Sequence, residues 1–219
     1  MALRTDAGDF IETYYKPLNP ALEKLRATNE DAGIPLILKE TEGMLSVLLD
    51  ICKPRKILEI GTAYGYSSIF FSCKCPEAHI TTIDRAEKFL NHAFKNIDEF
   101  GLRDRITVLQ GEASEVLRDL NDDSNEMNSY DFVFIDAGKT HYKEYFELSE
   151  SLCKSGALIV CDNILMSGWI YDRSLPGAKR HRTNAKYMRE FLEYLKNRED
   201  ISVSVSGGGD GLAVIKLNG

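Results

Sequence analysis

The stretch Lys56-Ile-Leu-Glu-Ile-Gly61-Thr-Ala-Tyr-Gly65-Tyr-Ser67 joins a short apolar strand to a turn that contains two glycines. Four further apolar runs follow it along the chain, at residues 79–84, 106–111, 131–136 and 157–162. Their apolar positions are almost continuous rather than alternating, which is typical of strands buried on both faces of a parallel sheet. The first run and its turn therefore predict an α/β fold in which the turn lies at the ligand-binding edge of the sheet.

Between these runs, apolar residues recur at helical spacing in residues 85–100, 142–152 and 184–197. The buried face of the first of these helices is expected to contain Phe89, Ala93, Phe94 and Ile97. Residues 201–206 alternate with period two, a glycine-rich turn follows, and residues 212–217 return as an antiparallel hairpin. The pattern predicts a doubly wound, mostly parallel sheet of seven strands that ends in this hairpin.

Ahead of the first strand, the pattern predicts two or three extra helical segments, at about residues 7–30 and 41–53. They carry no glycine-rich or catalytic pattern, and three roles are open to them: helical packing, a lid or a dimer surface. Residues 1–219 are predicted to form one domain, with residues 1–53 packed on it as helical segments.

The chain has 219 residues and a formal net charge of −7. A protein that holds long nucleic acids through phosphate contacts is usually basic, so this charge favours a small substrate and leaves RNA only a local patch. No apolar run approaches the roughly 20 residues of a membrane span, and residues 1–10 lack the apolar core of a signal peptide. The cytoplasm is the expected compartment.

The five cysteines are an odd number without zinc-site spacing, which favours buried free thiols.

The turn after Glu59 is not G-x-G-x-x-G and lacks the Gly-Lys-Ser/Thr of a P-loop, so neither a dinucleotide nor a nucleoside triphosphate is well supported. An acidic residue at the start of such a turn suits a cationic ligand better than a pyrophosphate. Asp84 ends the second run, 19 residues after Gly65, where a carboxylate can accept both hydroxyls of a ribose. The alternative for Asp84 is to cap the helix that starts at Arg85.

The fourth run ends in Asp136-Ala-Gly-Lys139, and the fifth ends in Asp162-Asn163. Two carboxylates and a carboxamide at adjacent strand ends make a hard-oxygen site for Mg²⁺, Mn²⁺ or Ca²⁺ rather than zinc. Lys139 could act as a general base, because burial and a neighbouring dication both favour its neutral form. Taken singly, Asp136 could cap a helix, Asp162 and Asn163 could form a turn, and Lys139 could be solvated. Their joint position favours a site.

In this order the motifs resemble the cation-dependent O-methyltransferases, a family that includes catechol and caffeoyl-CoA O-methyltransferases and bacterial relatives. The matching stretches are Glu59-Ile-Gly-Thr-Ala-Tyr-Gly-Tyr-Ser67, Thr82-Ile-Asp84, Gly111-Glu-Ala113, Asp136-Ala-Gly-Lys139-Thr-His-Tyr142, Asp162-Asn163 and Gly209-Asp-Gly-Leu212, within about residues 33–218. The resemblance implies the Rossmann-like fold of class I S-adenosylmethionine-dependent methyltransferases. It also implies two cofactors, S-adenosylmethionine and a divalent cation, and a homodimer.

The resemblance implies a role for each matching residue. Those expected to line the methionine part of the cofactor are Ile37, Glu59, Gly61, Tyr66 and Ser67. Asp84 would hold the ribose, and Glu112 and Ala113 would border the adenine; the family commonly has Glu in place of Asp84 and Asp in place of Glu112. The expected metal ligands are Asp136, Asp162 and Asn163, with Asp136 also near the cofactor amine and Lys139 as the catalytic base.

The resemblance leaves two alternatives for the methyl acceptor. The compact form of the chain looks most like the bacterial tRNA 5-hydroxyuridine methyltransferases, which implies methylation of the tRNA wobble position, in the anticodon region, to 5-methoxyuridine. Residues 168–184 would rim the acceptor pocket, where Trp169, Arg180 and Arg182 could stack a base and hold phosphates, unless this segment is a solvated loop. The other acceptor is a small catechol, a flavonoid or a hydroxycinnamoyl-CoA thioester, which the acidic net charge favours.

Two other classes of protein compete with an O-methyltransferase. A non-catalytic S-adenosylmethionine-binding module would be expected to lose residues such as Lys139 and Asn163, which are intact here. A dehydrogenase with a dinucleotide-binding domain would be expected to carry G-x-G-x-x-G, which the first turn lacks.

Overall fold

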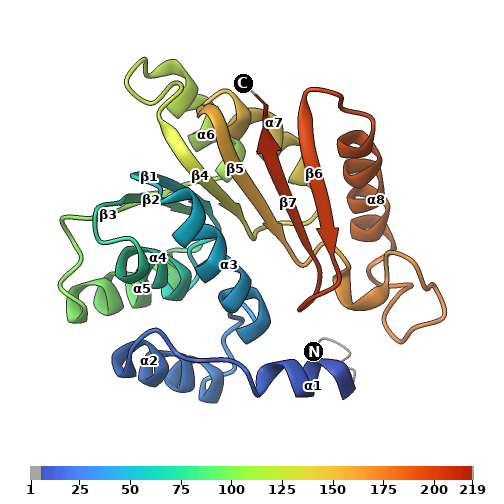
Figure 1. The fold of residues 1–219 in the computed structure, drawn as a ribbon, viewed down its shortest axis with the longest axis horizontal. Coiled ribbons are helices and arrows are strands. Elements are labelled where there is room, and N and C mark those ends of the chain that lie inside the picture. The colour runs from blue at the N-terminus through green and yellow to red at the C-terminus, as the bar shows by residue number, and fades with distance from the viewer. Residues whose placement is uncertain (1–5, 219) are drawn as a thin grey trace.

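The centre of the molecule is a seven-stranded sheet in a computed structural model that describes residues 6–218 (Figure 1). Residues 1–5, half of the segment examined for a signal peptide, and residue 219 lie outside this range. The parallel strands are β1 (Lys56–Ile60), β2 (His79–Asp84), β3 (Ile106–Gln110), β4 (Tyr130–Ile135) and β5 (Cys153–Asp162). The predicted hairpin is β6 (Ile201–Ser206) and β7 (Leu212–Leu217), and the order is β3-β2-β1-β4-β5-β7-β6. The predicted sheet is confirmed.

Helices connect the parallel strands and cover both faces of the sheet (Figure 1). They are α4 (Tyr66–Lys74), α5 (Glu87–Glu99), α6 (Ala113–Asp122) and α7 (Tyr142–Glu150), with α8 (Arg182–Lys196) before the hairpin. A short 3-10 turn, η1 (Met166–Gly168), follows β5. The strand order reverses between β1 and β4, and open α/β sheets bind ligands at such a point, beyond the carboxyl ends of the strands.

The buried face of α5 differs from the predicted one. Leu90, Ala93 and Ile97 are at most 2% exposed, whereas Phe89 and Phe94 are 37% and 38% exposed. The three buried residues lie three and four positions apart, so they form one stripe along the helix, and the two phenylalanines lie on either side of it. The prediction placed both phenylalanines on the buried face, but their angular position on the helix leaves them at its two edges.

Within residues 6–218, three helices precede β1, in agreement with the two or three helical segments predicted there. The first predicted segment is divided into α1 (Asp6–Glu12) and α2 (Pro20–Asp31), and the second is α3 (Lys39–Cys52). Asn19 caps the start of α2, because its side chain accepts the N–H of Leu22 at 2.9 Å. In Figure 1, α1 and α2 run along the lower edge, on the side to which the carboxyl ends of the parallel strands point.

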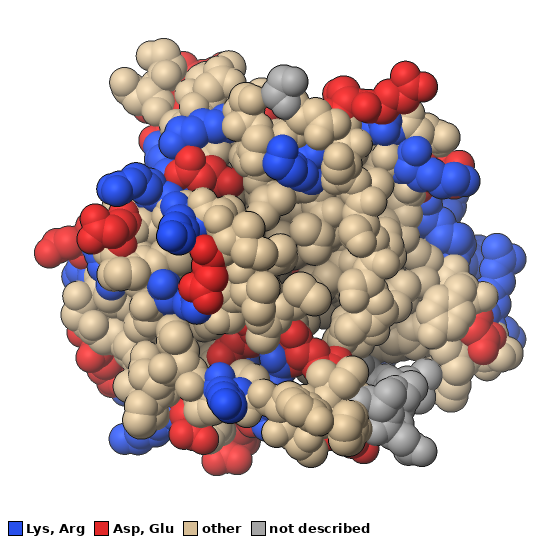
Figure 2. All heavy atoms as spheres, in the orientation of Figure 1, with Lys and Arg blue, Asp and Glu red and all other residues tan. Residues whose placement is uncertain are grey.

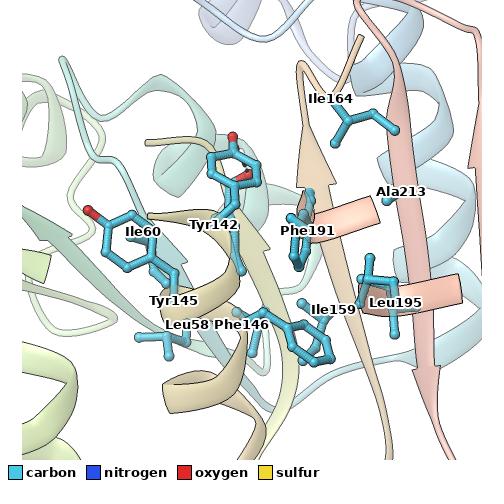
Figure 3. Packing of buried hydrophobic residues seen from close by; sticks show 14 of the residues in the cluster. Leu58, Ile60, Tyr142, Tyr145, Phe146, Ile159, Ile164, Phe191, Leu195 and Ala213 are labelled. Atoms are coloured by element: carbon cyan, nitrogen blue, oxygen red, sulfur yellow. Dashed lines mark hydrogen bonds between the residues drawn. The ribbon is translucent and has the colours of Figure 1, made fainter. Parts of the chain in front are cut away.

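Two hydrophobic clusters lie on opposite faces of the sheet. Ile57 belongs to one cluster, and Leu58 and Ile60 to the other; neighbouring side chains of a strand point to opposite faces. Figure 3 shows the second cluster, in which Tyr142 of α7 and Phe191 of α8 meet with ring centroids 5.9 Å apart. The fold is held by burial on both faces, as the nearly continuous apolar runs predict.

All five cysteines are free thiols, and Cys75, Cys153 and Cys161 are buried. Burial raises the pKa of Cys153 to about 12, so its thiol is a poor nucleophile near neutral pH. Within residues 6–218, no helix is long and apolar enough to span a membrane.

Candidate active site

The glycine turn after β1 opens directly beside the end of β4. Gly61 has φ +112°, and a Cβ atom at this position would lie 2.1 Å from the carbonyl oxygen of Asp136. Only glycine combines this backbone conformation with so close an approach. The N–H of Gly61 donates to the carbonyl of Ile83 and the N–H of Asp136 to that of Ile60, both at 2.9 Å. The ends of β1, β2 and β4 thereby form the floor of a site.

A cavity of about 1020 Å³ lies over this floor, between the strand ends and the N-terminal helices. Most residues predicted for the site line it: Ile37, Gly61, Tyr66, Ser67, Asp84, Glu112, Ala113, Asp136, Lys139, Asn163 and Trp169. Glu59 and Asp162 lie beneath the wall and are fully buried, whereas Arg180 and Arg182 are exposed outside the cavity. Ligand pockets commonly measure roughly 300–1,000 Å³, so this one has room for a cofactor together with an acceptor.

Glu59 is buried under the glycine turn among hydroxyl groups. Its carboxylate accepts hydrogen bonds from the hydroxyls of Ser67 and Ser68, and from that of Thr82 at 2.5 Å. Burial raises the pKa of Glu59 to about 7, although the three donors oppose the rise. The resemblance implies that Glu59 lines the cofactor site, but here Glu59 does not line the cavity itself and is hydrogen-bonded to Ser67, which does.

Asp84 ends β2 and uses both carboxylate oxygens to order the backbone. Oδ2 accepts the N–H of Ala63 and Oδ1 accepts that of Ala86, each at 2.9 Å. The alternative of a helix cap is not observed, because Ala86 is the N-cap of α5 and receives no side-chain cap. Lone pairs remain on both oxygens for ligand hydroxyls. At the nearby rim, Arg85 and Glu112 form an exposed ion pair of 3.0 Å.

Lys139 is the centre of the cluster at the ends of β4 and β5. Its Nζ donates to Oδ1 of Asp136 at 2.8 Å, to Oδ1 of Asn163 at 3.0 Å and to the hydroxyl of Tyr142 at 2.7 Å. The Tyr142 hydroxyl donates in turn to the carbonyl of Asp162 at 2.8 Å. Burial raises the pKa of Tyr142 well above its usual value, so it stays a neutral donor. Tyr142 was predicted only as the last residue of the motif that begins at Asp136, and its contact with Lys139, three residues earlier, gives it a role.

Asp162 adds a second, fully buried carboxylate to this cluster. Its Oδ1 accepts the N–H of Asn163 at 2.7 Å, whereas Oδ2 has no hydrogen-bond partner among residues 6–218. Burial raises the pKa of Asp162, and the neighbouring Asp136 raises it further. A buried polar atom without a partner is costly, and a cation would satisfy it. The oxygens of Asp136, Asp162 and Asn163 are a hard donor set that fits Mg²⁺.

One of the three candidate metal ligands is an amide side chain rather than a carboxylate. The described residues, 6–218, contain no group of three or more His, Cys, Asp or Glu side chains arranged to hold a metal. Only two of the candidate ligands, Asp136 and Asp162, are carboxylates, and Asn163 would be the third. Magnesium accepts such a set, because it is commonly held by one or two carboxylates together with water and substrate oxygens.

The backbone after β5 takes an uncommon path beside the cluster. Asn163, Met166 and Ser167 have φ of 54°, 52° and 54°, which is the left-handed region. Non-glycine residues in this region cost of order 1 kcal/mol each and gather at functional sites. Asp210 holds the segment, because its Oδ1 accepts the N–H of Ser167 at 2.5 Å and its carbonyl accepts that of Leu165 at 2.9 Å. Asp210 also lines the cavity. The sequence predicted it only as a member of the matching stretch Gly209-Asp-Gly-Leu212 and gave it no role.

The end of the cavity beside residues 168–184 has an aromatic wall. The rings of Trp169 and His181 stack with centroids 3.9 Å apart and planes 5° apart, and both residues line the cavity. Trp169 also donates from Nε1 to the carbonyl of Pro176 at 2.9 Å, which folds the intervening segment back on itself. The predicted rim segment is therefore divided: Trp169 and His181 line the cavity, whereas Arg180 and Arg182 do not.

Comparison with known proteins shows the family of this chain. Residues 13–217 match the family model described as O-methyltransferase. The chain is 34% identical to the catechol O-methyltransferase of Niastella koreensis over 166 residues, which cover 71% of this chain and 74% of that relative. It is 34% identical to the caffeoyl-CoA O-methyltransferase of Stellaria longipes over 128 residues, 58% of this chain and 53% of that relative.

The fold has close counterparts among solved structures. An O-methyltransferase from Bacillus cereus, solved in complex with S-adenosylhomocysteine (SAH), superposes with a TM-score of 0.82 at 26% identity, over 98% of each chain. The family match spans nearly the whole chain, so it includes the glycine turn and the Lys139 cluster. The chain therefore belongs to the O-methyltransferase family, and it is an enzyme with the fold of the class I S-adenosylmethionine-dependent methyltransferases.

Proposed function

We propose that this enzyme transfers a methyl group from S-adenosylmethionine to one of two neighbouring oxygens on a small, planar acceptor of the catechol type, assisted by a divalent cation. Catechols, flavonoids and hydroxycinnamoyl-CoA thioesters belong to this acceptor class. The observation that carries the proposal is the contact of Lys139 with Asp136 and Asn163, at 2.8 and 3.0 Å, in the same cavity as the glycine turn. The names of the catechol and caffeoyl-CoA relatives support the acceptor class.

The cofactor would lie along the glycine turn, which the SAH complex of the Bacillus cereus relative supports. The residues proposed for its methionine part are Ile37, Gly61, Tyr66 and Ser67, with Glu59 acting through Ser67. Asp84 would accept the ribose hydroxyls with its remaining lone pairs, and Glu112 and Ala113 would border the adenine. A carboxylate already fixed by two backbone N–H groups needs no reorganisation on binding, which favours affinity.

The cation would be held by Asp136, Asp162 and Asn163, whose oxygens include the unpartnered Oδ2 of Asp162 within residues 6–218. Mg²⁺ is the first choice for this set, and Mn²⁺ or Ca²⁺ would also fit it. When bound, the cation would favour the deprotonated form of the acceptor hydroxyl.

Lys139 would take the proton of the attacking hydroxyl at Nζ. It can do so only as a neutral amine, because an ammonium group has no lone pair. Tyr142 and Asp136 hold Nζ in place at 2.7 and 2.8 Å, so its direction is set before the acceptor arrives. The oxygen–carbon bond forms as the carbon–sulfur bond breaks, and much of the acceleration would come from holding the reacting atoms in line.

A second acceptor, 5-hydroxyuridine at the tRNA wobble position, is favoured by one observation. Basic residues near the acceptor end are exposed, among them Arg173, Lys179, Arg180 and Arg182. In Figure 2, Lys and Arg side chains also gather along the edge that α8 occupies in Figure 1. Against this acceptor stand the net charge of −7 and the position of Arg180 and Arg182 outside the cavity.

One assay separates these acceptors. The purified enzyme would receive methyl-labelled S-adenosylmethionine and Mg²⁺ with catechol, caffeoyl-CoA or 5-hydroxyuridine-containing tRNA, each with an EDTA control. We expect EDTA-sensitive label in a catechol-type acceptor, with no loss in an Arg180→Ala/Arg182→Ala double variant. Preferential label in tRNA, reduced about tenfold or more in the double variant, would replace the first acceptor with the second. If none of these acceptors is labelled, both proposals for the acceptor are wrong.

We also propose that the enzyme is a homodimer that pairs through α3. Met44, Val47 and Ile51 form an apolar stripe at helical spacing on α3 and are 42%, 54% and 73% exposed. Figure 2 shows that the centre of the face in view carries few charged side chains. A second copy would cover this stripe, because exposed apolar patches commonly mark contact surfaces.

A single domain over residues 1–219 and a cytoplasmic location stay predictions.

A further inference from the structure

An ion pair is buried where the N-terminal helices meet the cofactor cavity. Arg26 of α2 and Glu42 of α3 are 4% and 2% exposed, and Nη2 of Arg26 donates to Oε2 of Glu42 at 2.5 Å. Arg26 lines the cavity. A buried ion pair is a weak source of stability, because removing two charges from water offsets most of their attraction. The contacts of this pair indicate another role.

The guanidinium of Arg26 contacts two residues that line the cavity and come from different parts of the chain. Nη1 donates to the carbonyl of Ile37 at 3.0 Å, and Nε donates to the hydroxyl of Tyr66 at 3.2 Å. Ile37 lies in the segment before α3, whereas Tyr66 is the first residue of α4 after the glycine turn. The guanidinium also packs 4.6 Å from the centroid of the Tyr66 ring. One side chain thus sets the position of Ile37 relative to Tyr66.

Glu42 completes the arrangement. Its Oε2 also accepts the hydroxyl of Tyr66 at 2.6 Å, and its Oε1 accepts that of Tyr15 at 2.7 Å. Burial raises the pKa of Tyr66, so its hydroxyl remains a donor at neutral pH. Arg26 uses Nε and both Nη atoms on protein partners, with Glu30 as a further acceptor at 3.3 Å. Arg26 is therefore suited to hold the walls rather than to bind a ligand directly.

We propose that Arg26 and Glu42 are positioning residues that set the two walls of the cofactor cavity, Ile37 and Tyr66, at the separation required by the methionine part of S-adenosylmethionine. This inference rests on the proposed cofactor site. It gives the N-terminal helices a role in cofactor binding, beyond packing. It also predicts that substitution of either residue lowers the affinity for the cofactor more than it lowers the rate of the chemical step.

The test variant is Arg26→Lys, which keeps a positive charge beside Glu42 but loses the planar fork that reaches Ile37 and Tyr66 together. We expect the SAH dissociation constant, measured by calorimetry, to rise about tenfold. Without ligand, the peptide of residues 33–39 should exchange its amide hydrogens faster than in the wild type. The KM for S-adenosylmethionine should rise, and kcat at saturating cofactor should stay within about twofold.

The matched control is Tyr15→Phe. It removes a hydrogen bond of 2.7 Å from the same Glu42 carboxylate, but Tyr15 does not line the cofactor cavity. A lower melting temperature is expected in both variants, whereas only Arg26→Lys should weaken SAH binding and speed exchange in residues 33–39. Comparison of the two variants therefore separates a positioning role of Arg26 from a general loss of stability.

Wild-type SAH affinity and unchanged exchange of residues 33–39 in Arg26→Lys would overturn the inference, even if that variant melts earlier. An equal loss of affinity in Tyr15→Phe would overturn it as well. If the wild type itself does not bind SAH, the proposed function fails. The exchange measurement then still decides whether Arg26 orders residues 33–39.

Discussion

Replacing Glu59 with glutamine should change how the stability of this protein depends on pH. Glu59 is fully buried and accepts hydrogen bonds from the hydroxyls of Ser67, Ser68 and Thr82. Glutamine has the same shape but cannot ionise. The three hydroxyls can still bond to its amide, because a hydroxyl both donates and accepts. The comparison therefore isolates the ionisation of one buried group.

The magnitude follows from the position of the carboxylate. Burial raises the pKa of Glu59 from 4.5 to about 7 in the folded protein. One pKa unit corresponds to about 1.4 kcal/mol, so ionised Glu59 costs the folded state about 3 kcal/mol. Between pH 4.5 and 7 the folded state holds the proton more tightly than the unfolded state does, so the free energy of unfolding falls as pH rises. Ionised Glu59 therefore does not reduce the free energy of unfolding below about pH 4.5, and it reduces that free energy by its full amount above about pH 7.

Urea unfolding of the wild type and of Glu59→Gln, followed from pH 4.5 to 8, would measure this effect. The wild type should lose about 3 kcal/mol relative to the variant, mostly between pH 5 and 7. Burial also raises the pKa of Asp162, but this group is present in both proteins and cancels in the difference. A difference that is constant, or that grows in favour of the wild type with pH, would refute the reasoning: the three donors would then outweigh burial.

Three further predictions concern the metal, the glycine turn and the dimer. Asp162→Asn should lower Mg²⁺-dependent methylation by about 100-fold or more while calorimetry still detects SAH binding; undiminished Mg²⁺-dependent activity would contradict the metal assignment. Gly61→Ala places a Cβ 2.1 Å from the Asp136 carbonyl oxygen. In urea it should destabilise the fold by about 3 kcal/mol, and a wild-type midpoint would mean that β4 can move aside. Val47→Glu, which places a charge on the apolar stripe of α3, should convert a dimer to a monomer in light scattering; an unchanged mass would exclude this surface.

Much of the fold and the centre of the candidate site follow from local sequence. A parallel sheet buried on both faces leaves nearly continuous apolar runs, so the strands could be found one by one. The carboxyl ends of such strands lie at one edge, which is why Asp136, Lys139 and Asn163 could be grouped although β4 and β5 are separated by a helix. Their contacts at 2.8 and 3.0 Å agree with that grouping.

Local sequence thus specifies the order of elements and the residues at their ends, because apolar periodicity and turn residues act over a few positions. Packing decided the rest. Arg26 lies 16 residues from Glu42 and 40 from Tyr66, and on its own helix it looks like any solvated arginine. Packing likewise put Glu59 behind the cavity wall and Arg180 outside it. Such positions depend on how separate elements pack in three dimensions, and no local pattern encodes that geometry.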